Sequence, residues 1–138
     1  MAVKIYSKRI PVKTRRRIEL VNVTEEVKRV VREAGVKHGF VNVFCSHTTM
    51  GLYINEDEPN LRRDVEDFME KLAPVDAPYQ HNKIDNNAHA HLRSITLGHS
   101  ITIPVVNGEL ELGTWQSIFC AEFDGPRRRS ITVQVVGE

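Results

Sequence analysis

The chain has 138 residues, a length that suits one domain, so we expect residues 1–138 to fold together. A domain of this size folds without metal or disulfide staples, so a metal would serve function rather than structure. The 19 Lys and Arg nearly balance the 18 Asp and Glu, which argues against partners such as nucleic acid or anionic membrane. Early charges and the lack of any run of about 18 apolar residues predict a soluble, cytoplasmic protein.

Two strands and a helix are predicted at the start of the chain. Residues 3–7 and 17–23 are rich in β-branched residues and flank a basic turn, which favours two strands of a meander. A one-sided helix is predicted over 24–34, with Thr24 as its N-cap and Gly35 as its end.

The next segment predicts two strands and a second helix. Residues 40–46 alternate as a strand, and His47 continues its apolar face by the two-residue period. A short strand over 51–54 is followed by a helix that begins at Pro59 and stops before Pro74. Five residues form the predicted apolar face of this helix: Leu61, Val65, Phe68, Met69 and Leu72.

A long loop over 73–87 precedes a third helix, and loops of this length are more often functional than idle. Either Asn86 or Asn87 serves as the cap. The helical period places His91 on the apolar stripe, pointing inward, and His89 on the other side, pointing away. The stripe consists of four residues: Ala88, His91, Leu92 and Ile95.

The last third of the chain predicts four strands. Residues 100–106 and 109–112 flank Asn-Gly, the strongest short signal for a type I′ hairpin. Residues 115–123 and 130–136 are predicted as a second pair across a turn at 124–126. Many hairpins and few strand–helix–strand units indicate an α+β domain built on antiparallel sheets, with about three helices. The two cysteines fall in apolar runs without Cys-x-x-Cys spacing and are expected to be buried thiols: Cys45 and Cys120.

Three histidines come from separate elements and are candidates for one site: His47 from a strand, His81 from the loop and His91 from a helix. Converging neutral imidazoles are typical of a catalytic divalent metal. The alternative is that each is an isolated, hydrogen-bonded histidine, because no tight ligand pair such as His-x-x-x-His is present. Solvent exposure explains the other three: His38, His89 and His99.

An acidic turn, Asn55-Glu56-Asp57-Glu58, precedes the second helix. Glu56 is a candidate metal ligand or proton carrier. The alternative is helix capping and compensation of the helix dipole, which needs one or two of these acids.

A polar cluster at Gly113-Thr114-Trp115-Gln116 has the residue types to stack on a planar ring and hydrogen-bond a phosphate. Its alternative is a core tryptophan at a sheet rim. The basic run 127–129 is a candidate phosphate clamp or, equally, a solvated hairpin tip.

These motifs together resemble the YjbQ family, also called secondary thiamine-phosphate synthase-like proteins. The resemblance runs over essentially the whole chain and rests on Ser46-His47-Thr48-Thr49, Asn55-Glu56, the segment 87–92, Gly108 and, above all, Gly113-Thr114-Trp115-Gln116-Ser117-Ile118.

The resemblance implies two α+β sheets packed as a sandwich, a homotrimer, and an often metal-bound histidine site at His47, His81 and His91 beside Glu56. The implied activity is thiamine-phosphate synthesis, a transferase reaction that releases pyrophosphate. We assign catalysis to His47, Glu56 and His91. Substrate and phosphate binding are assigned to six residues: Thr48, Asn55, Thr114, Trp115, Gln116 and Arg129. The chain lacks the paired aspartates of magnesium diphosphate sites, so a zinc-like divalent ion fits better.

Two functions are therefore open: an enzyme acting on a phosphorylated heterocycle, or a non-catalytic module that binds a metal or phosphometabolite. We expect a small phosphorylated metabolite and other copies of the chain as partners, and neither nucleic acid nor membrane.

Overall fold

The computed structural model describes residues 2–138 and confirms the α+β class, with antiparallel pairing throughout both sheets. The larger sheet has five strands in the order β1 (Lys4–Lys13), β8 (Arg128–Gly137), β3 (His38–Cys45), β5 (Ser100–Val106) and β6 (Glu109–Leu110). The smaller sheet has three strands in the order β2 (Glu19–Asn22), β7 (Ser117–Glu122) and β4 (Met50–Asn55).

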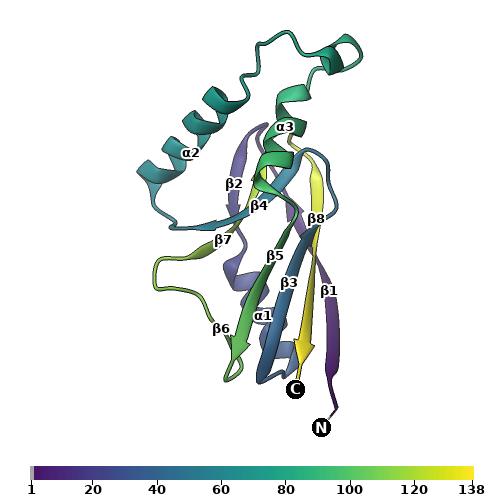
Figure 1. The fold of residues 1–138 in the computed structure, drawn as a ribbon, viewed down its shortest axis with the longest axis vertical. Coiled ribbons are helices and arrows are strands. Elements are labelled where there is room, and N and C mark those ends of the chain that lie inside the picture. The colour runs from purple at the N-terminus through teal and green to yellow at the C-terminus, as the bar shows by residue number, and fades with distance from the viewer. Residues whose placement is uncertain (1) are drawn as a thin grey trace.

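The two sheets pack over one apolar core, as Figure 1 shows for the ribbon. Helix α1 (Thr24–Ala34) covers one part of the inner face of the larger sheet, and the smaller sheet covers the rest. The helix contributes Val27, Val30 and Val31, each at most 2 % exposed. The predicted sandwich is thus confirmed, and its second layer consists of the smaller sheet and helix α1.

The predicted order of strands and helices is confirmed, but two predicted pairings are wrong. Strands β1 and β2 lie in different sheets, and so do β7 and β8. The turns that join each pair carry the chain from one sheet to the other. These two crossovers lie side by side, because the Thr14 amide donates to the Arg127 carbonyl and the Gly125 amide to the Arg17 carbonyl. Alternation in a sequence is the same whether neighbouring strands pair or change sheets, which explains the error.

The N-cap of helix α1 lies one residue earlier in the chain than predicted. Val23 occupies the cap position, and Thr24 is the first helical residue, whose hydroxyl donates to Asn22 Oδ1 and accepts from the Ile118 amide. The predicted end is confirmed, since Gly35 has a φ of 69°.

Helix α2 (Pro59–Leu72) has the predicted bounds but not the predicted burial. The Glu58 carboxylate caps it by accepting from the amides of Asn60 and Leu61, so the capping alternative is confirmed for this acid. Of the predicted apolar face, only Met69 is buried. Phe68 is 59 % exposed, and Figure 1 shows the helix standing away from the main body.

Helix α3 (Ala88–Leu97) follows a short 3₁₀ turn over Gln80–Lys83 and is rotated relative to the prediction. His89 and Arg93 are 0 % exposed, whereas Leu92 and Ile95 of the predicted inward stripe are 42 % and 70 % exposed. The expectation that His89 is solvated is therefore wrong. Its burial has a physical reason: Ala90 and Ser94 on the same side let the helix approach β4 closely.

Three smaller predictions can be compared directly. The Asn107-Gly108 turn has positive φ at both residues, 52° and 79°, as a type I′ hairpin requires. Cys45 and Cys120 are buried free thiols. Among the helices of residues 2–138, none combines the length and hydropathy needed to span a bilayer.

Candidate functional site

A buried ion pair organises the end of the molecule where the two sheets exchange strands. Arg129 donates from Nε and Nη2 to the two carboxylate oxygens of Glu122, at 2.7 Å and 2.6 Å, and also to the Thr49 hydroxyl at 2.7 Å. The Thr14 hydroxyl and the Asp124 amide donate to the same carboxylate, each at 2.9 Å. Every oxygen of this buried carboxylate is thereby satisfied.

The charge state of Glu122 follows from these contacts. Burial alone raises the pKa of the carboxyl group, but the hydrogen bonds from Arg129, the Asp124 amide and Thr14 outweigh it and hold the pKa below its ordinary value. Glu122 was missed in the sequence analysis, although an acid within the apolar run Ile118-Phe119-Cys120-Ala121 is a usable signal for a partnered buried charge. Because the Arg129 guanidinium is committed to Glu122 and Thr49, phosphate binding by this arginine stays a prediction.

His47 lies just beyond the end of β3 and is half buried. Strand β3 ends at Cys45, which pairs with Ile131 of β8. Beyond it, His47 Nε2 lies 3.1 Å from both the Ser130 amide nitrogen and the Ser130 carbonyl oxygen, so the ring bonds to the backbone of β8 in either tautomer. Burial, and then the nearby Arg129 charge, lower the pKa of His47, so the ring is neutral near pH 7. His47 thus extends the pairing between β3 and β8 beyond the last strand residue, and its catalytic role stays a prediction.

The second polar group lies at the start of α3. The rings of His81 and His91 meet edge to face with centroids 4.8 Å apart, on the wall of a cavity of about 360 Å³. The other walls are largely apolar and come from Tyr79, Gln80, Ala88 and Leu92. The structure therefore brings together two of the three predicted histidines.

A chain of hydrogen bonds fixes the orientation of His81. Its Nε2 lies 3.1 Å from Asn87 Oδ1, and Asn87 Nδ2 donates to Asp124 Oδ2 at 2.8 Å. Because the amide nitrogen faces the carboxylate, its oxygen must accept from His81, so Nε2 carries the proton and Nδ1 presents its lone pair. Asn87 was predicted as a helix cap and occupies that position, but its side chain forms this relay instead.

Arginines surround the outer end of the relay. Arg127 donates from Nη2 to Asp124 Oδ2 at 3.2 Å, and Arg17 Nη2 lies 3.9 Å from the other carboxylate oxygen. Burial alone raises the pKa of Asp124, but the bonds from Asn87 and Arg127 outweigh it and hold the pKa below its ordinary value. Both guanidinium groups are exposed and keep further N–H groups for an anion.

The remaining predicted site residues lie elsewhere in the chain. In the register of β4 and β7, Met50 faces Glu122 and Asn55 faces Ser117. Five residues of strand separate these two levels by about 17 Å. Four of the predicted residues lie at the Ser117 level or in the turns beside it, all exposed: Glu56, Thr114, Trp115 and Gln116.

Trp115 is 72 % exposed, so the alternative of a core tryptophan is wrong. Thr48 follows His47 in the loop after β3 and is also exposed. It lies near the level of Met50 and Glu122, away from Trp115.

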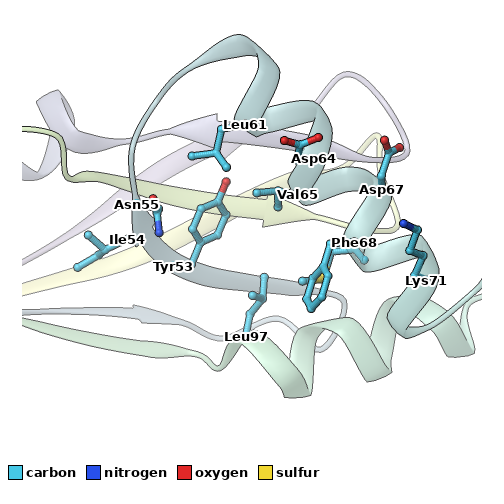
Figure 2. Close-up of a pocket in the computed structure, with 11 residues that line it drawn as sticks. Tyr53, Ile54, Asn55, Leu61, Asp64, Val65, Asp67, Phe68, Lys71 and Leu97 are labelled. Carbon is cyan, nitrogen blue, oxygen red and sulfur yellow. The ribbon is translucent and has the colours of Figure 1, made fainter.

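A larger groove of about 590 Å³ runs between α2 and β4 (Figure 2). Tyr53, Leu61 and Val65 line its floor, while the charged side chains of Asp64 and Asp67 stand at its rim. Burial raises the pKa of Tyr53 to about 12, so this phenol stays protonated. The groove lacks the convergent polar groups of the His81 cavity, which makes it a poorer place for phosphate chemistry.

The predicted metal requires more ligands than the described part of the chain brings together. Among residues 2–138, no three His, Cys, Asp or Glu side chains form a group able to hold a metal ion. His81 and His91 supply two imidazoles, and catalytic zinc takes three protein ligands. These two histidines alone do not fit a zinc-like ion. The zinc-like cofactor therefore remains an untested prediction, and no step below depends on it.

Comparison with known proteins gives a consistent result. Residues 8–138 match the family model described as UPF0047 protein YjbQ-like. A UPF0047 protein of Methanothermobacter thermautotrophicus is 50 % identical over 135 residues, covering 98 % of this chain and 94 % of that protein. The UPF0047 protein YugU of Bacillus subtilis is 36 % identical, covering 94 % and 98 %. A YbjQ-like protein of unknown function from Sulfolobus solfataricus superposes with a TM-score of 0.98 at 40 % identity, covering 99 % and 100 %.

Proposed function

This chain belongs to the UPF0047 YjbQ-like family, and we propose that it is an enzyme that acts on a phosphorylated heterocycle at the His81–His91 pair. The observation that carries the proposal is the relay from Asp124 through Asn87 to His81, which holds one imidazole in a fixed tautomer beside a second imidazole. A proton-transferring group oriented by a third side chain is the arrangement that general acid–base catalysis uses.

The chemistry proposed is transfer of a heterocyclic methylene group with loss of pyrophosphate, as in thiamine-phosphate synthesis. The ring nitrogen of a thiazole phosphate attacks the methylene carbon of a hydroxymethylpyrimidine diphosphate. The carbon–oxygen bond breaks, and pyrophosphate leaves with the electron pair. Arg17 and Arg127 would stabilise the charge that develops on the leaving oxygens, and an imidazolium at His81 or His91 would donate a proton to them.

A non-catalytic binding module is the second candidate. It is favoured by the largely apolar wall of the cavity, which holds a ring without adding reactive groups. In that case the arginines and imidazoles would retain a phosphorylated metabolite that leaves unchanged.

Product formation from the two named substrates tests the enzyme proposal. We expect His81→Gln and His91→Gln to lower turnover at least about 100-fold, the usual contribution of a general acid or base. His38→Gln, on an exposed residue of the sheet, is the matched control and should retain turnover. Wild-type protein that binds pyrophosphate in calorimetry but makes no product would favour the binding module, and His91→Gln with full turnover would exclude the pair from catalysis.

A further inference from the structure

Helix α3 carries its large apolar side chains on the outside. Leu92 and Ile95 are 42 % and 70 % exposed, and Ile84 in the preceding loop is 84 % exposed. The polar His89 and Arg93 take the buried side. Exposed apolar surface of this kind, beside a cavity, is typical of a protein–protein contact.

A projecting aromatic residue is present at the other end of the smaller sheet. Trp115, the only tryptophan of the sequence, is 72 % exposed at the tip of a tight turn. The turn is held by two bonds: the Gly113 amide donates to Gln116 Oε1 at 2.8 Å, and the Gln116 amide donates to the Gly113 carbonyl at 3.0 Å. An ordered, exposed tryptophan is the residue type most enriched at the energetic centre of interfaces.

The charges at the two ends are opposite. The cavity end carries a rim of exposed arginines at Arg15, Arg16, Arg17, Arg127 and Arg128.

The turn that carries Trp115 lies instead beside the acidic segment after β4, where Asn55 pairs with Ser117 and exposed Glu56 follows. Opposite charges on different ends of one chain favour a head-to-tail contact between copies.

We propose that the Trp115 turn of a second copy of this chain inserts into the His81–His91 cavity and completes the site. The inference rests on the function proposed above, because it concerns the same cavity. The indole would pack against the apolar wall of the cavity at Tyr79 and Leu92, which leaves the imidazole rings to the substrate, and Glu56, Thr114 and Gln116 of the second copy would meet the arginine rim. Within one chain these residues are separated by the length of β4, and across the contact they become one site.

The contact joins two different surfaces of the same chain, so it is heterologous. Repetition of such a contact closes into a ring when the rotation permits. The predicted homotrimer is one such ring.

The single tryptophan makes the contact directly measurable, without any turnover. In assembled protein we expect blue-shifted emission and weak quenching by acrylamide, and on dilution to single chains a red shift with strong quenching. Emission of an exposed indole in assembled protein would overturn the proposal.

Two variants distinguish assembly through the Trp115 turn from assembly through the outer face of the larger sheet. Sedimentation should show single chains for Trp115→Ala and unchanged assembly for Phe44→Ala, whose side chain is 45 % exposed on that face. The opposite pattern would overturn the proposal.

A mixture of Trp115→Ala and His91→Gln chains adds an activity arm. Each mixed contact can contain one intact site, so turnover should reappear although each variant alone is inactive. If the wild type proves inactive, the fluorescence and sedimentation results still decide the contact, which keeps the two proposals separable.

Discussion

At the scale of single residues, the Glu122–Arg129 pair decides how the two sheets meet. The side chains of both residues are at most 6 % exposed, and each is bonded to groups from other strands and turns. A buried ion pair adds little net stability when both partners are present, but removing one partner leaves an uncompensated charge.

We predict that Arg129→Met lowers the free energy of unfolding by about 3–5 kcal/mol, because the Glu122 carboxylate stays buried without its partner. The double variant Arg129→Met, Glu122→Leu should lose less than the single variant. Urea unfolding at pH 7 measures both. A double variant at least as unstable as Arg129→Met would show that the lost charge pairing is not the cause.

His89 is the second residue with a measurable consequence. It is 0 % exposed, and neither ring nitrogen has a hydrogen-bond partner within residues 2–138. Burial, and then the neighbouring Arg93 charge, lower the pKa of His89 in the folded state. The pKa of His47 is lowered in the same direction.

Below about pH 6.5 the unfolded chain takes up protons at these histidines that the folded chain does not, so the free energy of unfolding falls as pH falls. We predict that His89→Leu reduces this slope by at most about 1.4 kcal/mol per pH unit. Urea unfolding at pH 7.5, 6.5 and 5.5 measures the difference. Parallel curves for wild type and variant would contradict the buried, neutral state of His89.

At the scale of elements, α3 shows where sequence reasoning succeeds and where it stops. Its bounds followed from Asn87 and the helical period, but its orientation did not. Periodicity locates an apolar stripe and is silent on whether the stripe faces the chain's own core or another surface. The same limit applies to α2, whose Phe68 lies outside although it fits the predicted apolar face.

The orientation of α3 can be tested by two substitutions. Ala90 is 0 % exposed and packs in the cluster that contains Phe119 and Phe123, so we predict that Ala90→Leu lowers the free energy of unfolding by about 1–3 kcal/mol. Ile95→Ala, on the exposed side, should change it by less than about 0.5 kcal/mol. Urea unfolding at a concentration where sedimentation shows single chains makes the comparison. The reverse ranking would mean that the helix faces the other way.

The positions of the strands could be predicted from the sequence, but their pairings could not. Alternation marks β8 because Ile131, Val133 and Val135 each reach the core. The change of sheet between β7 and β8 depends on contacts such as Thr14 with Arg127, more than 100 residues apart, which no local pattern contains. The same limit applies to the candidate site. The sequence identified its histidines but not the side chains that hydrogen-bond them.

At the scale of the whole molecule, one end concentrates the chemistry. The His81–His91 pair, the Asp124 relay and the Glu122 network are joined through the bond from the Asp124 amide to Glu122. The chain termini lie at the opposite end of the larger sheet, as Figure 1 shows, so tags placed there should not disturb the site.

The central claim is that the His81–His91 cavity binds the phosphate part of a small molecule. It is tested most directly by NMR of protein carrying ¹³C-labelled histidine during a titration with inorganic pyrophosphate at pH 7. The account predicts saturable changes in the ring signals of His81 and His91, with His38 unchanged. Saturation at other histidines, or no change at this pair, would contradict it.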